Sequence, residues 1–249
     1  MKQILAGVIA YQPSNLPAAI RQYHEQYDAC KAVGIPPELG LYQCVVNGPA
    51  GKALTVLFVW ASLDLDQGQI WLSKVSSWAP IAMSNVLPTT MTAFNEITNS
   101  MVPKQVYGTM HSASFYKLTS EVMDVICEHA PLQPNNPEIM FGIHELRAEA
   151  PKPSGSSVFN AHFPHFAYEI IPMVSSKGSM DDALEWGRRF HEALLKTDPA
   201  NVCPAVYVSF IPSKEMDVKA IFGRKYEPLR LAKKQFDPHN RFNTALVQP

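Results

Sequence analysis

Two motifs near the end of the chain decide how the rest of the sequence is interpreted. Residues 222–229 read Phe-Gly-Arg-Lys-Tyr-Glu-Pro-Leu, and residues 235–242 read Gln-Phe-Asp-Pro-His-Asn-Arg-Phe. The first motif contains the run Gly-x-x-Tyr-Glu-x-Leu, and the second contains Asp-Pro-x-Asn-x-Phe. The residues between them predict a short helix, so that the two motifs flank one helical element.

The composition is that of a globular protein that is large enough to bury a sizeable core. The chain has 249 residues, of which 47% are hydrophobic and 17% are charged. Its net charge of −1 gives no reason to expect nucleic acid or an anionic membrane as a partner. The short apolar run after Lys2 is interpreted as a buried first strand and not as a signal peptide. Four widely spaced cysteines indicate free thiols in a reducing compartment, and the predicted location is cytoplasmic.

The spacing of apolar residues predicts a mixture of strands and helices. Residues 3–11 form an Ile- and Val-rich strand, and Ser14 and Asn15 cap an amphipathic helix. A hairpin is predicted over 40–47 and 53–61. Further strands are predicted at 105–116, 138–147, 166–174 and 205–211, with helices over 64–78 and from Thr89/Thr90, from Thr119 and from Ser179, where Asp182 completes a capping-box-like start. No Gly-rich phosphate loop follows any of these strands, so the pattern predicts an α+β domain with an antiparallel sheet.

The two C-terminal motifs resemble the C-terminal signature of the berberine-bridge-enzyme-like, FAD-linked oxidases. From residues 5–11 onward, the chain falls into register with the substrate-binding domain of that family. The resemblance implies a single substrate-binding-type domain over 1–249, with the signature in 222–249. It also implies a broad antiparallel sheet with helices packed on one face, the other face covering flavin and substrate in the intact enzymes. The flavin-binding domain of the family would precede residue 1, so its flavin-attaching His and Cys are not carried over to this chain.

Four positions depart from the family pattern. In the predicted strand 205–211, Ser209 replaces an asparagine, and Phe210 stands where some plant members carry a tyrosine base. Leu246 replaces an amide, and Pro228 replaces an arginine. Together with the flavin domain that is not in this sequence, these departures predict that the chain holds no cofactor, with FAD as the alternative.

Polar groups on otherwise apolar strands mark the candidate site. A carboxylate on a sheet lined by Ile, Phe and Val is costly unless it is paired or faces a wet pocket. In the strand 138–147, alternation places Glu145 and Arg147 on one face and His144 on the other. The resemblance implies a catalytic carboxylate near the end of this strand, for which both Glu145 and Glu149 are candidates. The candidate catalytic residues are Glu145, Glu169, His144, Arg147, Tyr207 and His111, and the candidate pocket residues are Tyr168, Ser209, Phe210, Trp60 and Phe115.

The sequence contains no metal or nucleotide motif. His162 and His165 are three residues apart in a proline-containing segment, which is interpreted as a loop and not as a metal pair. Neither a Gly-rich dinucleotide motif nor a phosphate-binding loop is present in the sequence.

These observations lead to three functional hypotheses. The first is a flavin-independent cyclase or isomerase, of which a Diels–Alder pericyclase is one form, acting on a polycyclic or polyketide-like intermediate in an apolar pocket on the sheet face. The second is the substrate-binding half of an FAD-dependent oxidoreductase that completes a flavin site on a separate flavoprotein. The third is a non-catalytic carrier of a small apolar ligand. Without a flavin domain, one face of the sheet would be a large exposed apolar surface. The sequence therefore also predicts a homodimer with a pocket on that face, in which a second copy of the chain covers the surface.

Overall fold

The computed structural model describes residues 3–147, 161–204, 206–211 and 217–243. Its centre is a nine-stranded sheet with the order β4-β1-β3-β2-β7-β8-β6-β9, in which β5 also pairs with β1. Every strand pairing in this sheet is antiparallel, as the sequence predicts. The strands are β1 (Ile4–Tyr11), β2 (Leu39–Gly48), β3 (Gly51–Trp60), β4 (Ile81–Ser84), β5 (Leu87–Thr89), β6 (His111–Phe115), β7 (Met140–Leu146), β8 (His165–Ile171) and β9 (Val202–Cys203).

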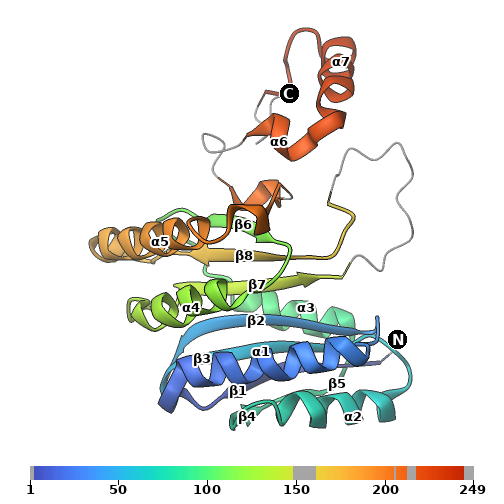
Figure 1. The fold of residues 1–249 in the computed structure, drawn as a ribbon, viewed down its shortest axis with the longest axis vertical. Helices are drawn as coiled ribbons and strands as arrows, with labels where there is room; N and C mark the ends of the chain where they lie inside the picture. Colours follow the sequence, from blue (N-terminus) through green and yellow to red (C-terminus); the bar gives the residue numbers. More distant parts are fainter. Residues whose placement is uncertain (1–2, 148–160, 205, 212–216, 244–249) are drawn as a thin grey trace.

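Three helices, α1 (Leu16–Val33), α4 (Ser120–His129) and α5 (Met180–Leu195), pack on one face of this sheet (Figure 1). The other helices are α2 (Leu65–Ser76), α3 (Met91–Ser100), α6 (Val218–Phe222) and α7 (Tyr226–Phe236). In the part of the chain that the structure describes, no helix is long and apolar enough to cross a membrane.

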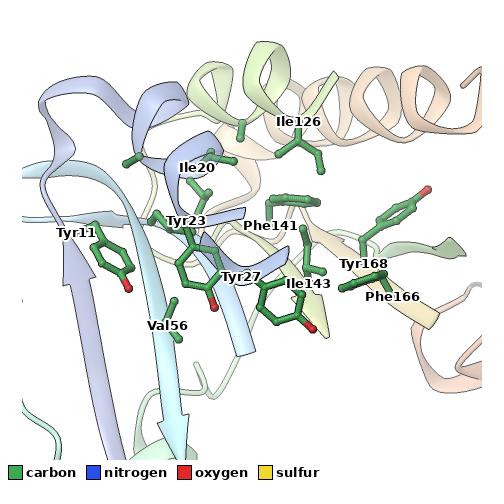
Figure 2. Close-up of a cluster of buried hydrophobic side chains, with 14 of the residues drawn as sticks. Tyr11, Ile20, Tyr23, Tyr27, Val56, Ile126, Phe141, Ile143, Phe166 and Tyr168 are labelled. Atoms are coloured by element: carbon green, nitrogen blue, oxygen red, sulfur yellow. The ribbon is translucent and has the colours of Figure 1, made fainter. Parts of the chain in front are cut away.

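The main hydrophobic core lies between the sheet and these three helices. Figure 2 shows Tyr23 and Tyr27 of α1 beside side chains from β7 and β8. The ring of Tyr27 meets Phe166 edge-on at 6.3 Å, and Phe190 of α5 lies 4.7 Å from Phe141. The cross-strand register places Phe141 and Phe166 on the same side of the sheet, which we call the covered face.

Helix starts follow the caps that the sequence predicts, with one exception. The side chains of Asn15, Thr90 and Thr119 each accept a hydrogen bond from a backbone N–H in the first turn of their helix. Ser179 makes no such bond at the start of α5, although the sequence predicts a capping-box-like start there. Its backbone angles of −105° and 8° are not those of an extended cap, because a 3-10 turn at Lys177–Ser179 already leads into the helix.

One predicted strand is shorter than expected, and another is not formed in the described residues. The strand predicted over 105–116 is confined to β6, because Gly108 adopts a φ of 143° and turns the chain close against Met173. Residues 206–211, the described part of the strand predicted over 205–211, contain no strand. The last strand of the sheet, β9, lies just before this range and stops at Cys203, directly before Pro204, whose nitrogen cannot donate to the ladder. The segment Val208–Phe210 is a 3-10 turn instead. The loop predicted over 151–157 lies outside the described residues.

A buried histidine makes the stability of this core depend on pH. His24 of α1 is only 6% exposed, and burial lowers its pKa from 6.5 to about 4, an effect that the nearby Gln43 amide partly opposes. Between these two pH values His24 therefore binds a proton in the unfolded chain but not in the folded chain. We expect the stability from this group to be fully present above pH 6.5 and to decline as the pH falls toward 4, by up to about 3 kcal/mol. Urea unfolding across this pH range measures this change in the free energy of unfolding.

The matched variant for this prediction is His24→Gln, which keeps a polar side chain of similar length but cannot titrate. We expect the unfolding free energy of this variant to vary less with pH between 6.5 and 4 than that of the parent. Equal pH slopes for the two proteins would show that His24 is not the responsible group.

Candidate functional site

The opposite face of the sheet, which we call the open face, carries three functional side chains from adjacent strands. Tyr42 of β2 pairs with His144 of β7, and Gly142 of β7 pairs with Glu169 of β8. Directly paired residues of antiparallel strands point to the same side, so Tyr42, His144 and Glu169 share this face. They lie in the middle of the sheet, where three strands hold them in a fixed register.

Glu169 is the centre of this cluster. Its Oε1 accepts a hydrogen bond from the Tyr42 hydroxyl, and Nε2 of His144, which lies 3.2 Å away, donates to the same oxygen. The imidazole of His144 also stacks on the Tyr42 ring at 4.3 Å between centroids. Within the described residues, no hydrogen bond reaches the second carboxylate oxygen, Oε2. The cluster therefore holds Glu169 through one of its two carboxylate oxygens.

Gly142 is what allows Tyr42 to reach Glu169 across the intervening strand. A Cβ atom at position 142 would lie 2.8 Å from Cζ and 3.0 Å from Cε2 of Tyr42, closer than side chains approach one another. Its contact with the hydroxyl oxygen would be closer still. The phenol ring thus lies flat over a glycine, and this is a close approach that only glycine permits.

Burial fixes the charge states around Glu169. The Glu169 side chain is 6% exposed and that of His144 is 37% exposed. Burial raises the pKa of Tyr42 well above its ordinary value, with smaller contributions from Cys44 and Glu169. Burial likewise raises the pKa of the Cys44 thiol to about 12. Tyr42 consequently stays neutral near pH 7 and acts as a permanent donor to the carboxylate.

Apolar side chains surround this cluster on the open face. Cross-strand partners place Val46, Leu57, Val59, Met140 and Ile171 on the same side as Tyr42 and Glu169, and all five are half-buried. A carboxylate surrounded by such residues is poorly solvated, so its hydrogen bonds from Tyr42 and His144 matter for keeping it ionised.

Glu145 and Arg147, both predicted as catalytic, lie away from this cluster. The register confirms that Glu145 faces the side opposite to His144. There Oε1 of Glu145 lies 3.8 Å from Lys31 Nζ, and Arg147 donates to the carbonyl of Leu39. These groups border a separate cavity of about 210 Å³ at the end of α1. Glu149, the other carboxylate considered, lies outside the described residues.

The structure also places four other predicted residues on the covered side. His111 stacks on His191 at 4.9 Å, and the Tyr168 hydroxyl is 2.9 Å from Nδ1 of His191. Phe115 stacks on Tyr168 within the core, and the indole N–H of Trp60 donates to the carbonyl of Asp64. The prediction of Tyr168, Trp60 and Phe115 as pocket residues is thus corrected: alternation along their strands turns them into the helix layer.

The turn at 207–210 places an aromatic side chain at the edge of the Tyr42–His144–Glu169 cluster. The Phe210 ring lies 6.2 Å from His144, and Tyr207 packs edge-on against Phe210 at 4.8 Å. Ser209 is exposed. Phe210 therefore borders the site, whereas Tyr207 reaches it only through Phe210. Leu246, another departure from the family pattern, lies outside the described residues.

Tyr42 is the member of the cluster that sequence reasoning misses. The sequence indicates only one core aromatic among several at this position, because a tyrosine on an apolar strand usually packs. Its role depends on the glycine of β7 that lies beneath it. Nothing in the sequence shows which of several glycines lies under the Tyr42 ring, since that depends on the register between strands that are 98 residues apart.

Comparison with known proteins confirms the resemblance that the sequence indicates. No family model matches the chain. The chain is 23% identical over 244 residues to the FAD-linked oxidoreductase aurO of Gibberella zeae, covering 97% of this chain and 47% of that protein. The sheet and its helices have the fold of berberine-bridge-enzyme-like proteins.

Two solved structures illustrate this match. A variant of berberine bridge enzyme superimposes with a TM-score of 0.73 at 13% identity, covering 99% of this chain and 55% of that one. CrmK, a flavoenzyme of caerulomycin biosynthesis, gives a TM-score of 0.73 at 13% identity, with coverage of 96% and 54%. The chain thus spans about half the length of the relatives that it matches.

These relatives raise the question of whether the residues of this chain suit FAD. Among the described residues, the glycines with a positive φ are Gly34, Gly51, Gly108 and Gly223. Each ends a helix or turns a connection, and none lies in a Gly-rich turn between a strand and a helix, where backbone N–H groups hold phosphates. The described part of the chain therefore contains no Gly-rich phosphate-binding turn of this kind.

Proposed function

We propose that this chain is a proton-transfer enzyme of the cyclase or isomerase class, acting on a polycyclic or polyketide-like natural-product intermediate on the open face. The observation that carries the proposal is the cluster at Glu169, in which both hydrogen bonds go to Oε1 and apolar side chains of the neighbouring strands share the same face of the sheet. Relatives with this fold include CrmK of caerulomycin biosynthesis and GilR of gilvocarcin biosynthesis, which supports a substrate of this kind.

In this proposal Glu169 is the acid–base group and the other two residues position it. Oε2 takes a proton from a C–H or O–H group of the substrate, and the electron pair that is released moves into the adjacent carbonyl. The same carboxyl group then returns a proton at another atom, which completes an isomerisation or accompanies ring closure. Tyr42 and His144 stabilise the carboxylate form through Oε1, and the apolar residues exclude water.

A second candidate is the substrate-binding part of an FAD-linked oxidoreductase. The relationship to aurO, which extends over 97% of this chain, favours it. In that role Glu169 would carry out the same proton transfer, while residues outside this sequence would hold the flavin. A third candidate, a carrier of small apolar ligands, would need the open face but not the carboxylate.

Deuterium exchange in D₂O distinguishes these candidates. The probe is 1-tetralone, a bicyclic aromatic ketone with exchangeable protons next to its carbonyl. We expect the chain without added flavin to speed deuterium incorporation, measured by mass spectrometry. Exchange that appears only when a flavoprotein is supplied would favour the oxidoreductase, and binding of the ketone without exchange would favour the carrier.

A further inference from the structure

The signature motifs at the end of the chain form a small, preorganised unit. Residues 217–243, which we call the C-terminal arm, comprise α6, a 3-10 turn and α7. The Asp237 carboxylate bonds to Lys233 and accepts the backbone N–H groups of Arg241 at 2.7 Å and Phe242 at 3.0 Å. Asn240 adopts a φ of 49°, which closes the turn. The Asp-Pro-x-Asn-x-Phe motif is thus a turn tied together by one carboxylate.

This turn presents large apolar side chains to solvent. Phe236 is 80% exposed, Phe242 is 77% exposed and Leu231 is 56% exposed. No residue of α7 is buried, and Figure 1 shows α6 and α7 standing away from the sheet. Two phenylalanines held outward on a fixed turn are typical of a docking surface, because ordering them beforehand lowers the entropic cost of binding.

A second group of exposed apolar side chains lies along residues 81–102, from β4 through α3, and we call this group the methionine surface. Its exposed apolar side chains are Ile81, Met83, Leu87, Met91, Ile97, Met101 and Val102. Its three methionines are flexible and make favourable contacts with aromatic rings. α3 contacts β1 but has no buried residue, and the seven apolar side chains named above are exposed in the chain as described.

The charges of the two surfaces are complementary. The arm has seven Lys and Arg residues against three Asp and Glu, a net charge of +4, while the whole chain has −1. The remainder of the chain therefore carries −5, and the only charged residue of the methionine surface is the acidic Glu96. A basic, aromatic arm matches an apolar surface with an acidic group.

We propose that the chain forms a two-fold symmetric dimer in which the arm of each copy docks Phe236 and Phe242 onto the methionine surface of the other. Within one copy both surfaces are exposed, and reciprocal docking buries both in each copy at once. Two-fold symmetry makes this docking reciprocal, so that each arm and each receiving surface is used once and the assembly closes as a dimer.

Sedimentation analysis of the full 249-residue chain tests the dimer. We expect the parent to be dimeric at micromolar concentration. Phe236→Ser combined with Phe242→Ser should raise the dimer dissociation constant at least tenfold, with an unchanged circular dichroism spectrum because both side chains are exposed. Val33→Ser, at a residue that is 79% exposed at the end of α1, is the matched control and should leave the dimer intact.

Mixing two defective variants gives the sharper result. Ile97→Lys places a positive charge on the methionine surface, opposite the basic arm, and should also give a monomer. A mixture of Ile97→Lys with the double Phe variant retains one intact arm and one intact receiving surface, so we expect a heterodimer to form. A monomeric parent, or a dimer that survives both sets of changes, would overturn the proposal.

Discussion

Replacing Glu169 with glutamine is expected to lower turnover by about 10²–10⁴-fold while the protein stays folded. Glutamine keeps the size of the side chain and can still accept from Tyr42, but it cannot take up a proton. The change therefore removes the chemistry at Oε2 and spares the packing on β8. The measurement is the rate of deuterium incorporation into 1-tetralone, with urea unfolding of the variant as the check on its fold.

Glu25→Gln is the matched control for this prediction, because Glu25 is an exposed carboxylate on the outer side of α1. It should leave the rate unchanged. An equal loss in both variants would point to a general effect of charge, and a Glu169→Gln protein that retains the parent rate would exclude Glu169 as the proton-transfer group.

Gly142→Ala is expected to be the most disruptive small change on the open face. The added Cβ would meet the Tyr42 ring at 2.8–3.0 Å, so the ring must move away from Glu169 or the strands must separate. Such overpacking typically costs about 1–3 kcal/mol in the free energy of unfolding. We expect that loss together with a large fall in the exchange rate, because Glu169 loses one of its two donors, the Tyr42 hydroxyl.

Gly40→Ala is the control for this effect, since it also adds a methyl group to a strand glycine. At position 40 the new Cβ would find its nearest neighbours at 3.7 Å, which is ordinary contact. Urea unfolding and exchange rates of the two variants should therefore differ clearly. Equal behaviour would show that the close approach of Tyr42 to Gly142 is not what the site depends on.

Sequence reasoning predicts the sheet, its helices and the faces of β7 correctly, because these follow from local periodicity. Alternation alone separates His144 from Glu145, and the register confirms it. It fails where the outcome depends on pairing between distant strands. To place Tyr168 and Phe115 one must know which face of the sheet α5 covers. The sequence does not show this, whereas the structure does, through the contact of Tyr168 with His191 of α5.

Two members of the cluster, Glu169 and His144, can be predicted from the sequence, but their contacts cannot. Glu169 and His144 stand out because charged and polar groups on apolar strands need a reason. Their meeting at one carboxylate oxygen depends on the β7–β8 register, and the contribution of Tyr42 depends on a glycine of β7 that is distant from it in sequence. The short last strand is missed because Pro204 interrupts a run that otherwise has strand-forming residues.

The visible absorption spectrum of the purified native chain, followed by denaturation and assay of any released flavin, tests the central claim most directly. Our account predicts a colourless, folded protein that exchanges deuterium into 1-tetralone through Glu169 and gains no stoichiometric flavin when FAD is added. A flavin spectrum at one equivalent per chain would contradict it and would make the open face part of an oxidoreductase site.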